Sequence, residues 1–311
     1  MTYVAETYLG ETITLNAPIY VRMNSSEDAP ADDINVVFPI NDNVDELCKI
    51  KVYQGDTLVF NGIVDKQQIS YDIDGAILKI QARSTAAILL DNEAMPQNYN
   101  IASFADIFNR HAKPYGFNLL CNDNRTFCSD FHVYKGMSEW EVLSNFCKQL
   151  LSAFPRVDHN NNIYLSTNHI NNEICFSNTQ DGVRYTSISK TINRHYLYSV
   201  VKVRTDNNGQ YDTVVLDEDS IRRRINKTRY FSTVDSKNNS IQYINSLLQR
   251  SRKKAMGIDV ICPTEPCVKV SEIVSIDDPI IGKTENLVVY STQYILSNTG
   301  EFSRISLRRS D

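Results

Sequence analysis

The sequence predicts an α+β protein that is mainly β, with two antiparallel β domains on either side of a small α/β domain. Two observations support this fold class. Residues 1–96 and 181–311 contain short runs in which apolar and polar side chains alternate, a pattern typical of half-buried strands. Residues 97–180 instead place apolar side chains three and four positions apart, which is typical of helices packed on a core. We therefore expect three domains with these boundaries.

The first β domain contains two predicted hairpins. In ELCKIKVYQGDTLVFNGIVD, two alternating runs flank the turn residues QGD. In QISYDIDGAILKIQARS, Asp74 and Gly75 suit the positive φ angles of a tight turn, and the strand that follows alternates apolar and polar positions. The two hairpins predict a small antiparallel barrel or sandwich.

The central domain is predicted to begin with a helix that Ser103 caps and that ends near Pro114 and Gly116. We interpret His111 as a residue at the edge of the core and not as a catalyst. The predicted buried face of this helix consists of Phe104, Ile107, Phe108 and His111.

A second central helix is predicted from signals at both of its ends: Ser138 and Glu141 form a capping box at its start, and Pro155 stops it. A strand, an Asn-rich turn and another strand follow in RVDHNNNIYLST. The predicted buried face of the helix consists of Leu143, Phe146, Cys147, Leu150, Leu151 and Phe154.

The last domain is predicted to be β with one long helix. The Asn-Gly pair in LYSVVKVRTDNNGQYDTVVLD predicts a hairpin turn. NNSIQYINSLLQRSRKKAMG predicts a helix with a basic last turn, which suits the helix dipole, and with Gly257 as its C-terminal cap. The predicted buried face of this helix consists of Ile241, Ile244, Leu247 and Leu248.

The segment DDPIIGKTE contains Gly-Lys-Thr, the end of a phosphate-binding loop. A complete loop has a glycine five positions before the Gly-Lys pair and runs from a strand into a helix. Asp277 occupies that position, and LVVYSTQYIL after the segment predicts a strand. We therefore interpret the segment as a turn between two strands of the last domain.

Composition excludes several classes of protein. The 311 residues are 42% hydrophobic, enough for a full core, and the net charge of −5 does not call for a nucleic-acid or membrane partner. No run of 18 apolar residues and no apolar leader occurs, so we expect no membrane span, no export, and assembly in the cytosol. The seven scattered cysteines favour reduced thiols.

No metal, cofactor or catalytic site is predicted. The pair Cys262 and Cys267 in CPTEPC lacks the further soft ligands of a zinc site, and the Asn-rich turn lacks the carboxylates of a calcium site. The motifs HExxH, GxSxG and GxGxxG are absent, and the five histidines have no ligand spacing. We expect no enzyme, although a cell-wall-active or carbohydrate-active enzyme stays open as an alternative.

A nucleic-acid-binding module is the other alternative, because basic residues form two clusters with Tyr230 and Phe231 close by for base stacking. The clusters match no known module. They consist of Arg222, Arg223, Arg224, Lys227 and Arg229 in the first case, and of Arg250, Arg252, Lys253 and Lys254 in the second.

Three segments carry a resemblance to a known family: VYQGDTLVFNGIVDKQQISYDIDGAILKIQARS, FHVYKGMSEWEVLSNFCKQLLSAFPRVDHNNNIYLST and VSEIVSIDDPIIGKTENLVVYSTQYILSNTGEFSRISLRR. Their order of strands, turns and one capped helix resembles the baseplate hub proteins of contractile phage tails and phage-tail-like bacteriocins. This family includes the Mu-type hub and the late-control D protein. The likeness covers most of the chain, in patterns of apolar residues and turns.

The resemblance implies a homotrimer at the tail tip, with two similar β-barrel-like domains per chain in a ring that joins the hexameric tail tube to the trimeric central spike. Tape measure and other baseplate proteins are further implied partners, and nucleic acid at most passes through the lumen. The basic clusters would line the lumen or hold acidic neighbours. We expect Leu58–Val64 and Val288–Leu296 to occupy corresponding places in the two β domains. The Asn, Ile, Lys and Tyr content suits an AT-rich host, such as that of a clostridial phage or bacteriocin.

Overall fold

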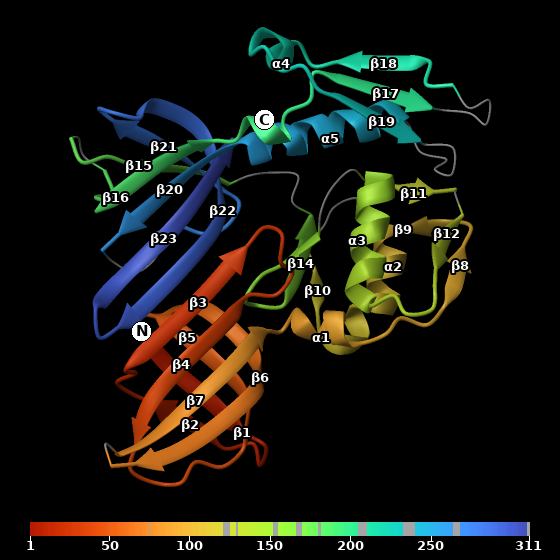
Figure 1. The fold of residues 1–311 in the computed structure, drawn as a ribbon. Helices are drawn as coiled ribbons and strands as arrows, with labels where there is room; N and C mark the ends of the chain where they lie inside the picture. The colour runs from red at the N-terminus through yellow and green to blue at the C-terminus, as the bar shows by residue number, and fades with distance from the viewer. Residues whose placement is uncertain are drawn as a thin grey trace. The chain divides into compact units, whose positions relative to one another are not determined.

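A computed structural model of the chain describes residues 1–73, 75–120, 125–128, 130–151, 155–165, 170–179, 182–204, 210–232, 240–263 and 268–309. The chain forms two compact units. Unit 1 contains residues 1–170, 263–271 and 291–303, and unit 2 contains residues 171–262, 272–290 and 304–311. Strands dominate both units (Figure 1), which confirms the mainly β, α+β fold class.

The β part of unit 1 is an antiparallel sheet in which neighbouring strands follow the order β3-β4-β7-β6-β5-β1-β2. Leu78, Ile80 and Ala82 are buried on one face of β7, as the alternation predicted. Gly75 has the predicted positive φ, while Asp74 lies outside the described residues. The strands are β1 (Thr2–Thr7), β2 (Thr12–Leu15), β3 (Tyr20–Ser26), β4 (Asp33–Ile40), β5 (Leu47–Gln54), β6 (Thr57–Asp72) and β7 (Gly75–Ser84).

The α/β part of unit 1 packs helices α2 and α3 on a second core. Ser103 caps α2 as predicted and also forms a capping box with Asp106, and the predicted capping box of Ser138 and Glu141 is present on α3. The elements are α1 (Ala87–Asp91), β8 (Gln97–Tyr99), β9 (Ala102–Ser103), α2 (Phe104–His111), η1 (Lys113–Tyr115), β10 (Asn118–Leu119), β11 (Thr126–Phe127), β12 (Phe131–Val133), α3 (Glu139–Phe146), η2 (Cys147–Leu151), β13 (Pro155–Val157) and β14 (Asn162–Leu165).

The second central helix departs from its predicted form. The α-helix ends at Phe146, and Cys147–Leu151 form the π-helical turn η2, in which each turn contains more residues than in an α-helix. The 3.6-residue spacing that was expected to run to Pro155 therefore stops at Phe146. Phe146 is buried as predicted, whereas Phe154 and the side chain of Leu150 lie outside the described residues.

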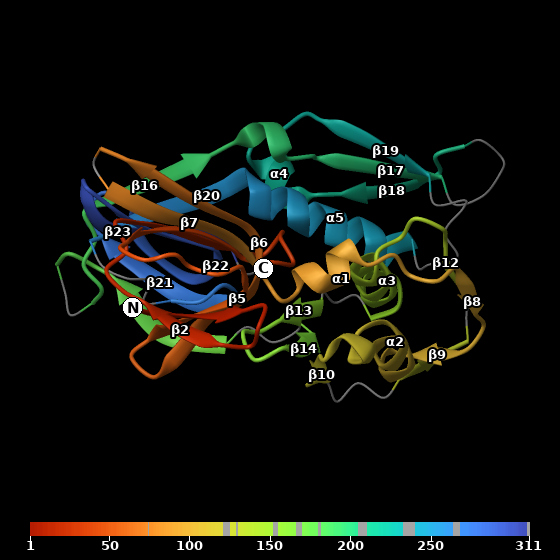
Figure 2. The same ribbon diagram turned by 90° about the horizontal axis from the view of Figure 1, so that it is seen from below.

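Unit 2 combines strands of the same 13-stranded sheet with a separate three-stranded sheet. The three-stranded sheet β18-β17-β19 packs on α5 through Val201, Val203, Ile244 and Leu248 (Figure 2). The elements are β15 (Ile170–Phe176), β16 (Ser187–Ile192), η3 (Arg194–Tyr196), β17 (Val200–Arg204), β18 (Thr213–Leu216), α4 (Glu218–Arg222), β19 (Thr228–Ser232), α5 (Ser240–Ala255), β20 (Met256–Cys262), β21 (Glu272–Asp278), β22 (Gly282–Ser297) and β23 (Gly300–Arg309).

Three expectations for the last domain can be compared with these elements. Strands β17 and β18 pair antiparallel, as the hairpin pattern predicted, although the Asn-Gly turn itself lies outside the described residues. Gly257 is not a helix cap, because α5 ends at Ala255 and strand β20 begins at the next residue. Ile244 and Leu248 are buried in α5 as predicted, and the side chain of Ile241 is outside the described part.

The Gly-Lys-Thr segment lies between two strands, as interpreted. Strands β21 and β22 pair antiparallel around it, and Lys283 forms an exposed ion pair with Glu285 at 2.8 Å. Asp278 accepts hydrogen bonds from the backbone N–H groups of Ile280 and Ile281, at 2.9 and 2.7 Å. The backbone N–H groups of Ile280 and Ile281 therefore already have a carboxylate acceptor.

The same strand topology occurs twice in the chain. Repeat 1 (β1, β3, β4, β5, β6 and β7) has the order β3-β4-β7-β6-β5-β1. Repeat 2 (β15, β16, β20, β21, β22 and β23) has the order β16-β20-β23-β22-β21-β15, so each strand has a counterpart in the same sequential and spatial position. The two predicted β domains are thus similar. Their described pairings form open sheets and close no barrel.

The repeats match strand by strand but not in the expected register. Strands β6 and β22 are counterparts, have 16 residues each, and lead into the 10-residue strands β7 and β23. When the two hairpins are aligned at their turns, Leu58–Val64 correspond to residues 283–289 and not to Val288–Leu296. The expected strands are therefore right and the expected register is wrong.

Candidate functional site

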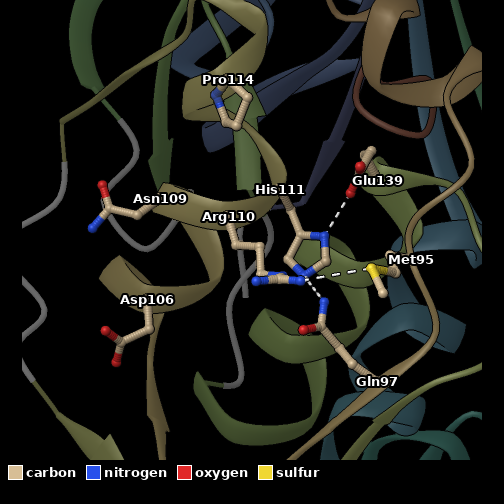
Figure 3. A pocket seen from close by; sticks show the side chains of 8 residues that line it. All are labelled: Met95, Gln97, Asp106, Asn109, Arg110, His111, Pro114 and Glu139. Atoms are coloured by element: carbon tan, nitrogen blue, oxygen red, sulfur yellow. Dashed lines mark hydrogen bonds and ion pairs between the residues drawn. The ribbon is translucent and has the colours of Figure 1, made fainter.

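A cavity of about 550 Å³ opens in the α/β part of unit 1, beside α2 and the start of α3 (Figure 3). The buried His111, at the end of α2, forms one part of its wall, and Arg110 lies beside it with a guanidinium nitrogen 3.8 Å from the sulfur of Met95. The lining residues are Met95, Gln97, Asp106, Asn109, Arg110, His111, Pro114 and Glu139.

His111 and Glu139 form a buried pair in this wall. Their side chains are 2% and 9% exposed, and His111 Nδ1 lies 2.5 Å from Glu139 Oε2. Because a carboxylate only accepts hydrogen bonds, Nδ1 is the donor. On the other side of the ring, Nε2 lies 2.9 Å from the Tyr99 hydroxyl, and Tyr115 donates to Glu139 Oε1 at 3.1 Å. Burial raises the pKa of both tyrosine hydroxyls, and the hydrogen bond to Glu139 adds to the rise at Tyr115.

This geometry holds the elements together and leaves no ring nitrogen of His111 without a partner. His111 is buried where the core borders the cavity, which agrees with its interpretation as a residue at the edge of the core. Glu139 was not predicted as a site residue, although its position carried a signal. Glu139 precedes Val142, Leu143 and Phe146 at helical spacing, and it therefore shares their buried face.

The first basic cluster lies at α4 and β19 in unit 2. Arg222 and Arg223 form ion pairs with Asp219, at 3.6 and 2.8 Å. Lys227 donates to the carbonyl oxygen of His195 at 2.5 Å. Arg224 has a positive φ of 59° at the end of α4.

The aromatic residues near the first cluster are partly covered by its own cations. The guanidinium of Arg229 lies over the rings of Tyr198 and Phe231, and the ammonium of Lys227 also lies over Tyr198. Tyr230 is exposed, with Lys202 over its ring. Phe231 thus packs within the unit and is not free to stack on a base, while Tyr230 stays accessible.

The second basic cluster lies at the end of α5, where Arg250, Lys253 and Lys254 accompany Arg252. Arg252 donates to Asp217, the cap of α4, with nitrogen–oxygen distances of 2.7 and 3.3 Å. Burial alone would raise the pKa of Asp217, but hydrogen bonds from Arg252 and Ser220 outweigh it and hold the pKa below the ordinary 3.8. The fold therefore brings the two predicted clusters together through Asp217.

Replacing Arg252 with alanine is expected to destabilise unit 2 by about 1–3 kcal/mol at pH 7, because the buried Asp217 carboxylate loses its cation. A lowered pKa contributes stability above the ordinary pKa, and this stability disappears as the pH falls through the lowered value. The deficit of the variant should therefore shrink below about pH 4. Hydrogen exchange of α5 amides measures it, with the exposed Lys254→Ala as control. An equal effect of both substitutions would contradict the assignment.

Strand edges form another candidate site. Strand β22 pairs with two different strands along one edge. Its first half pairs with Ile273–Val274 and Ile276–Asp278 of β21, and its second half, Ser291–Leu296, pairs with Val21–Ser26 of β3. Tyr294 is only 3% exposed because it packs into the core of repeat 1, where Leu296 also packs. Gln293 and Asn24 face each other in this ladder with a side-chain hydrogen bond of 2.8 Å.

No model of a protein family matches the chain, and no curated protein matches it. Solved structures do. A tail protein from Neisseria meningitidis MC58 matches 99% of this chain and 96% of its own length, with 14% identity and a TM-score of 0.79. The 43 kDa tail protein of prophage MuSo2 from Shewanella oneidensis matches 99% and 98%, with 15% identity and a TM-score of 0.79. The fold is that of phage tail proteins.

The chain is also similar in fold to a protein of a bacterial secretion system. A component of the type VI secretion system of E. coli, described as structurally similar to the T4 phage tail proteins gp27 and gp5, matches 94% of this chain and 74% of its own length. The identity is 8% and the TM-score is 0.53. The resemblance to phage tail proteins is therefore confirmed at the level of fold. No helix in the described ranges is long and apolar enough to cross a membrane.

Proposed function

We propose that this chain is a structural baseplate hub of a contractile injection particle, either a phage or a headless phage-tail-like bacteriocin. In this role it forms a homotrimer that joins a hexameric tail tube to a trimeric central spike. The observation that supports the proposal most strongly is the repeated six-strand topology of repeats 1 and 2. Three chains with two such repeats each present six similar units to a tube while keeping three-fold symmetry for a spike.

A closed ring also suits the exposed strand edges. Unpaired edges of sheets promote uncontrolled association, and proteins avoid this by covering or pairing them. Head-to-tail contacts between identical chains end in a ring when the rotation closes. The tail-protein fold supports this role, and the proposed partners are the spike, the tube, the tape measure and other baseplate proteins. Assembly would take place in the host cytoplasm.

We propose no catalytic role for the chain, and any nucleic acid would only pass through the lumen. The ion pairs of Arg222, Arg223 and Arg252 within unit 2 support a structural role for the basic clusters. The division into domains 1–96, 97–180 and 181–311 is part of the proposal. It assigns the ring to the first and last domains together with β15, the strand of repeat 2 that falls within 97–180, and leaves the rest of the central domain as an attached module.

The proposal predicts three copies of this chain in each particle. Native mass measurement of the hub and spike complex isolated from assembled particles gives the count. Three copies are expected, because three chains supply six repeats. Six copies, or a position away from the junction of tube and spike in an image of the particle, would contradict the adaptor role. A monomer of the purified chain would not, because assembly can need its partners as a template.

A further inference from the structure

The two repeats can be compared residue by residue at their terminal hairpins. Gly75 begins β7 and Gly300 begins β23. Leu78, Ile80 and Ala82 are buried along β7, and their counterparts along β23 are buried as well: Ser303, Ile305 and Leu307. Counted back through the turns, Ile69 of β6 corresponds to Tyr294 of β22, and Tyr71 corresponds to Leu296.

These counterparts have opposite environments. Tyr294 and Leu296 pack against the core of repeat 1, and their strand pairs with β3. Ile69 is 42% exposed and Tyr71 is 84% exposed, although both occupy the same positions in their hairpin. The ladder between β5 and β6 stops at Ile63. Among the described residues, no strand pairs with Gln68–Tyr71 on that side of β6.

Within the described ranges, the outer edge of β16, the counterpart of β3, is unpaired in the same way as this edge of β6. Strand β16 corresponds to β3 and pairs with β20, as β3 pairs with β4. In the described part of the chain, no strand pairs with its outer edge. Ile192, at the end of β16, is an apolar side chain that is 60% exposed. As far as the structure describes it, each chain thus has these two unpaired edges, on β6 and on β16. Their counterparts, β22 and β3, pair with each other within the chain.

We propose that the free edge of β6 pairs antiparallel with the β16 edge of a second copy of this chain, in the way that β22 pairs with β3. The pairing buries Ile69 and Tyr71 against the second copy. This inference rests on the proposed ring, and it identifies the surface that closes the ring. Each chain then gives β6 to one neighbour and takes a β6 strand on its own β16 from the other.

The internal contact also predicts the register. In repeat 1, Asn35 lies opposite Gln81. In repeat 2, Ser306 is the counterpart of Gln81, and its hydroxyl donates a hydrogen bond to Asp259. Asn35 and Asp259 are therefore counterparts. Asn35 pairs with Arg22 on β3, and Asp259 pairs with Ser189 on β16, so Arg22 and Ser189 are counterparts as well. Two residues further along each strand, Thr191 is the counterpart of Asn24. Gln68 is the counterpart of Gln293, which faces Asn24. Gln68 of one copy should therefore face Thr191 of the next.

Cross-linking in assembled particles tests the register. Gln68→Cys and Thr191→Cys are introduced together, and the particles are oxidised with copper phenanthroline. Facing positions in an antiparallel ladder have the Cα separation that a disulfide needs. Covalent dimers and trimers on a non-reducing gel are the expected result. The pair Gln293→Cys and Asn24→Cys should cross-link only within a chain, and Gln68→Cys with Lys190→Cys, one residue out of register, should cross-link much less.

A charge substitution tests the burial. Tyr71→Lys should reduce the yield of three-copy assemblies at least about tenfold, as a substitution at the centre of an interface does. Tyr8→Lys, at a tyrosine that is 63% exposed, should leave the yield unchanged. Three-copy particles without the cross-link would overturn this interface and leave the proposed hub intact. If particles contain no three-copy ring, the hub proposal and this interface fail together.

Discussion

Glu139→Ala is expected to lower the free energy of unfolding of the α/β part of unit 1 by about 1–3 kcal/mol for each of the two donors, on His111 and Tyr115, that lose their acceptor. The loss follows from the position of His111, which is buried and would keep a polar ring nitrogen without its acceptor. Tyr115 would lose its hydrogen bond to the same carboxylate. Denaturant unfolding followed by tryptophan emission measures the effect, because Trp140, the sole tryptophan, packs against this core.

A double-mutant cycle provides the control for the pair. Removing His111 and Glu139 together should cost less than the sum of the two single substitutions, because the double variant keeps no unpaired partner. Glu139→Gln retains the size of the side chain and an acceptor oxygen, so its loss should be smaller than that of Glu139→Ala. Additive single effects would show that His111 and Glu139 stabilise the fold independently.

Phe146→Ala is expected to destabilise the same part by about 3–5 kcal/mol, as truncation of a buried phenylalanine does. Phe146 is fully buried and contacts the rings of Phe127 and Phe131 edge to face, with centroids 6.1 and 5.3 Å apart. Its removal leaves a cavity between α3 and two strands. The emission of Trp140 again follows the transition, so both variants report on one core.

The matched control for Phe146 is an exposed aromatic residue of the same unit. Tyr134 is 66% exposed, so Tyr134→Ala should change the stability by less than about 0.5 kcal/mol. A small effect of Phe146→Ala would mean that η2 lets the end of the helix collapse into the space.

Local signals predicted much of the fold. The capping residues Ser103 and Ser138 mark the starts of α2 and α3, because a cap is a contact within one helical turn. Glycine was read correctly at the turn of Gly75 and wrongly at Gly257, since a strand and a helix cap can both contain glycine. The π-helical turn at Cys147 has no local signature in this sequence.

The candidate sites were harder to predict, because they depend on contacts between distant residues. Glu139 lies on an apolar helix face, but its partner His111 belongs to another helix. The arginines of the two clusters were recognised as basic, but no local pattern marked Asp217 as the buried acidic partner of Arg252. The pairing of β3 with β22 joins the start of the chain to its end, beyond any periodic pattern.

That pairing determines the order in which the protein can fold during synthesis. The edge of β3 emerges early from the ribosome, while its partner Ser291–Leu296 is made near the end of the chain. Contacts between residues so far apart in sequence form slowly. Until then the nascent chain exposes a strand edge that can pair with other chains. The edge of β3 therefore stays without this partner throughout translation of the rest of the chain.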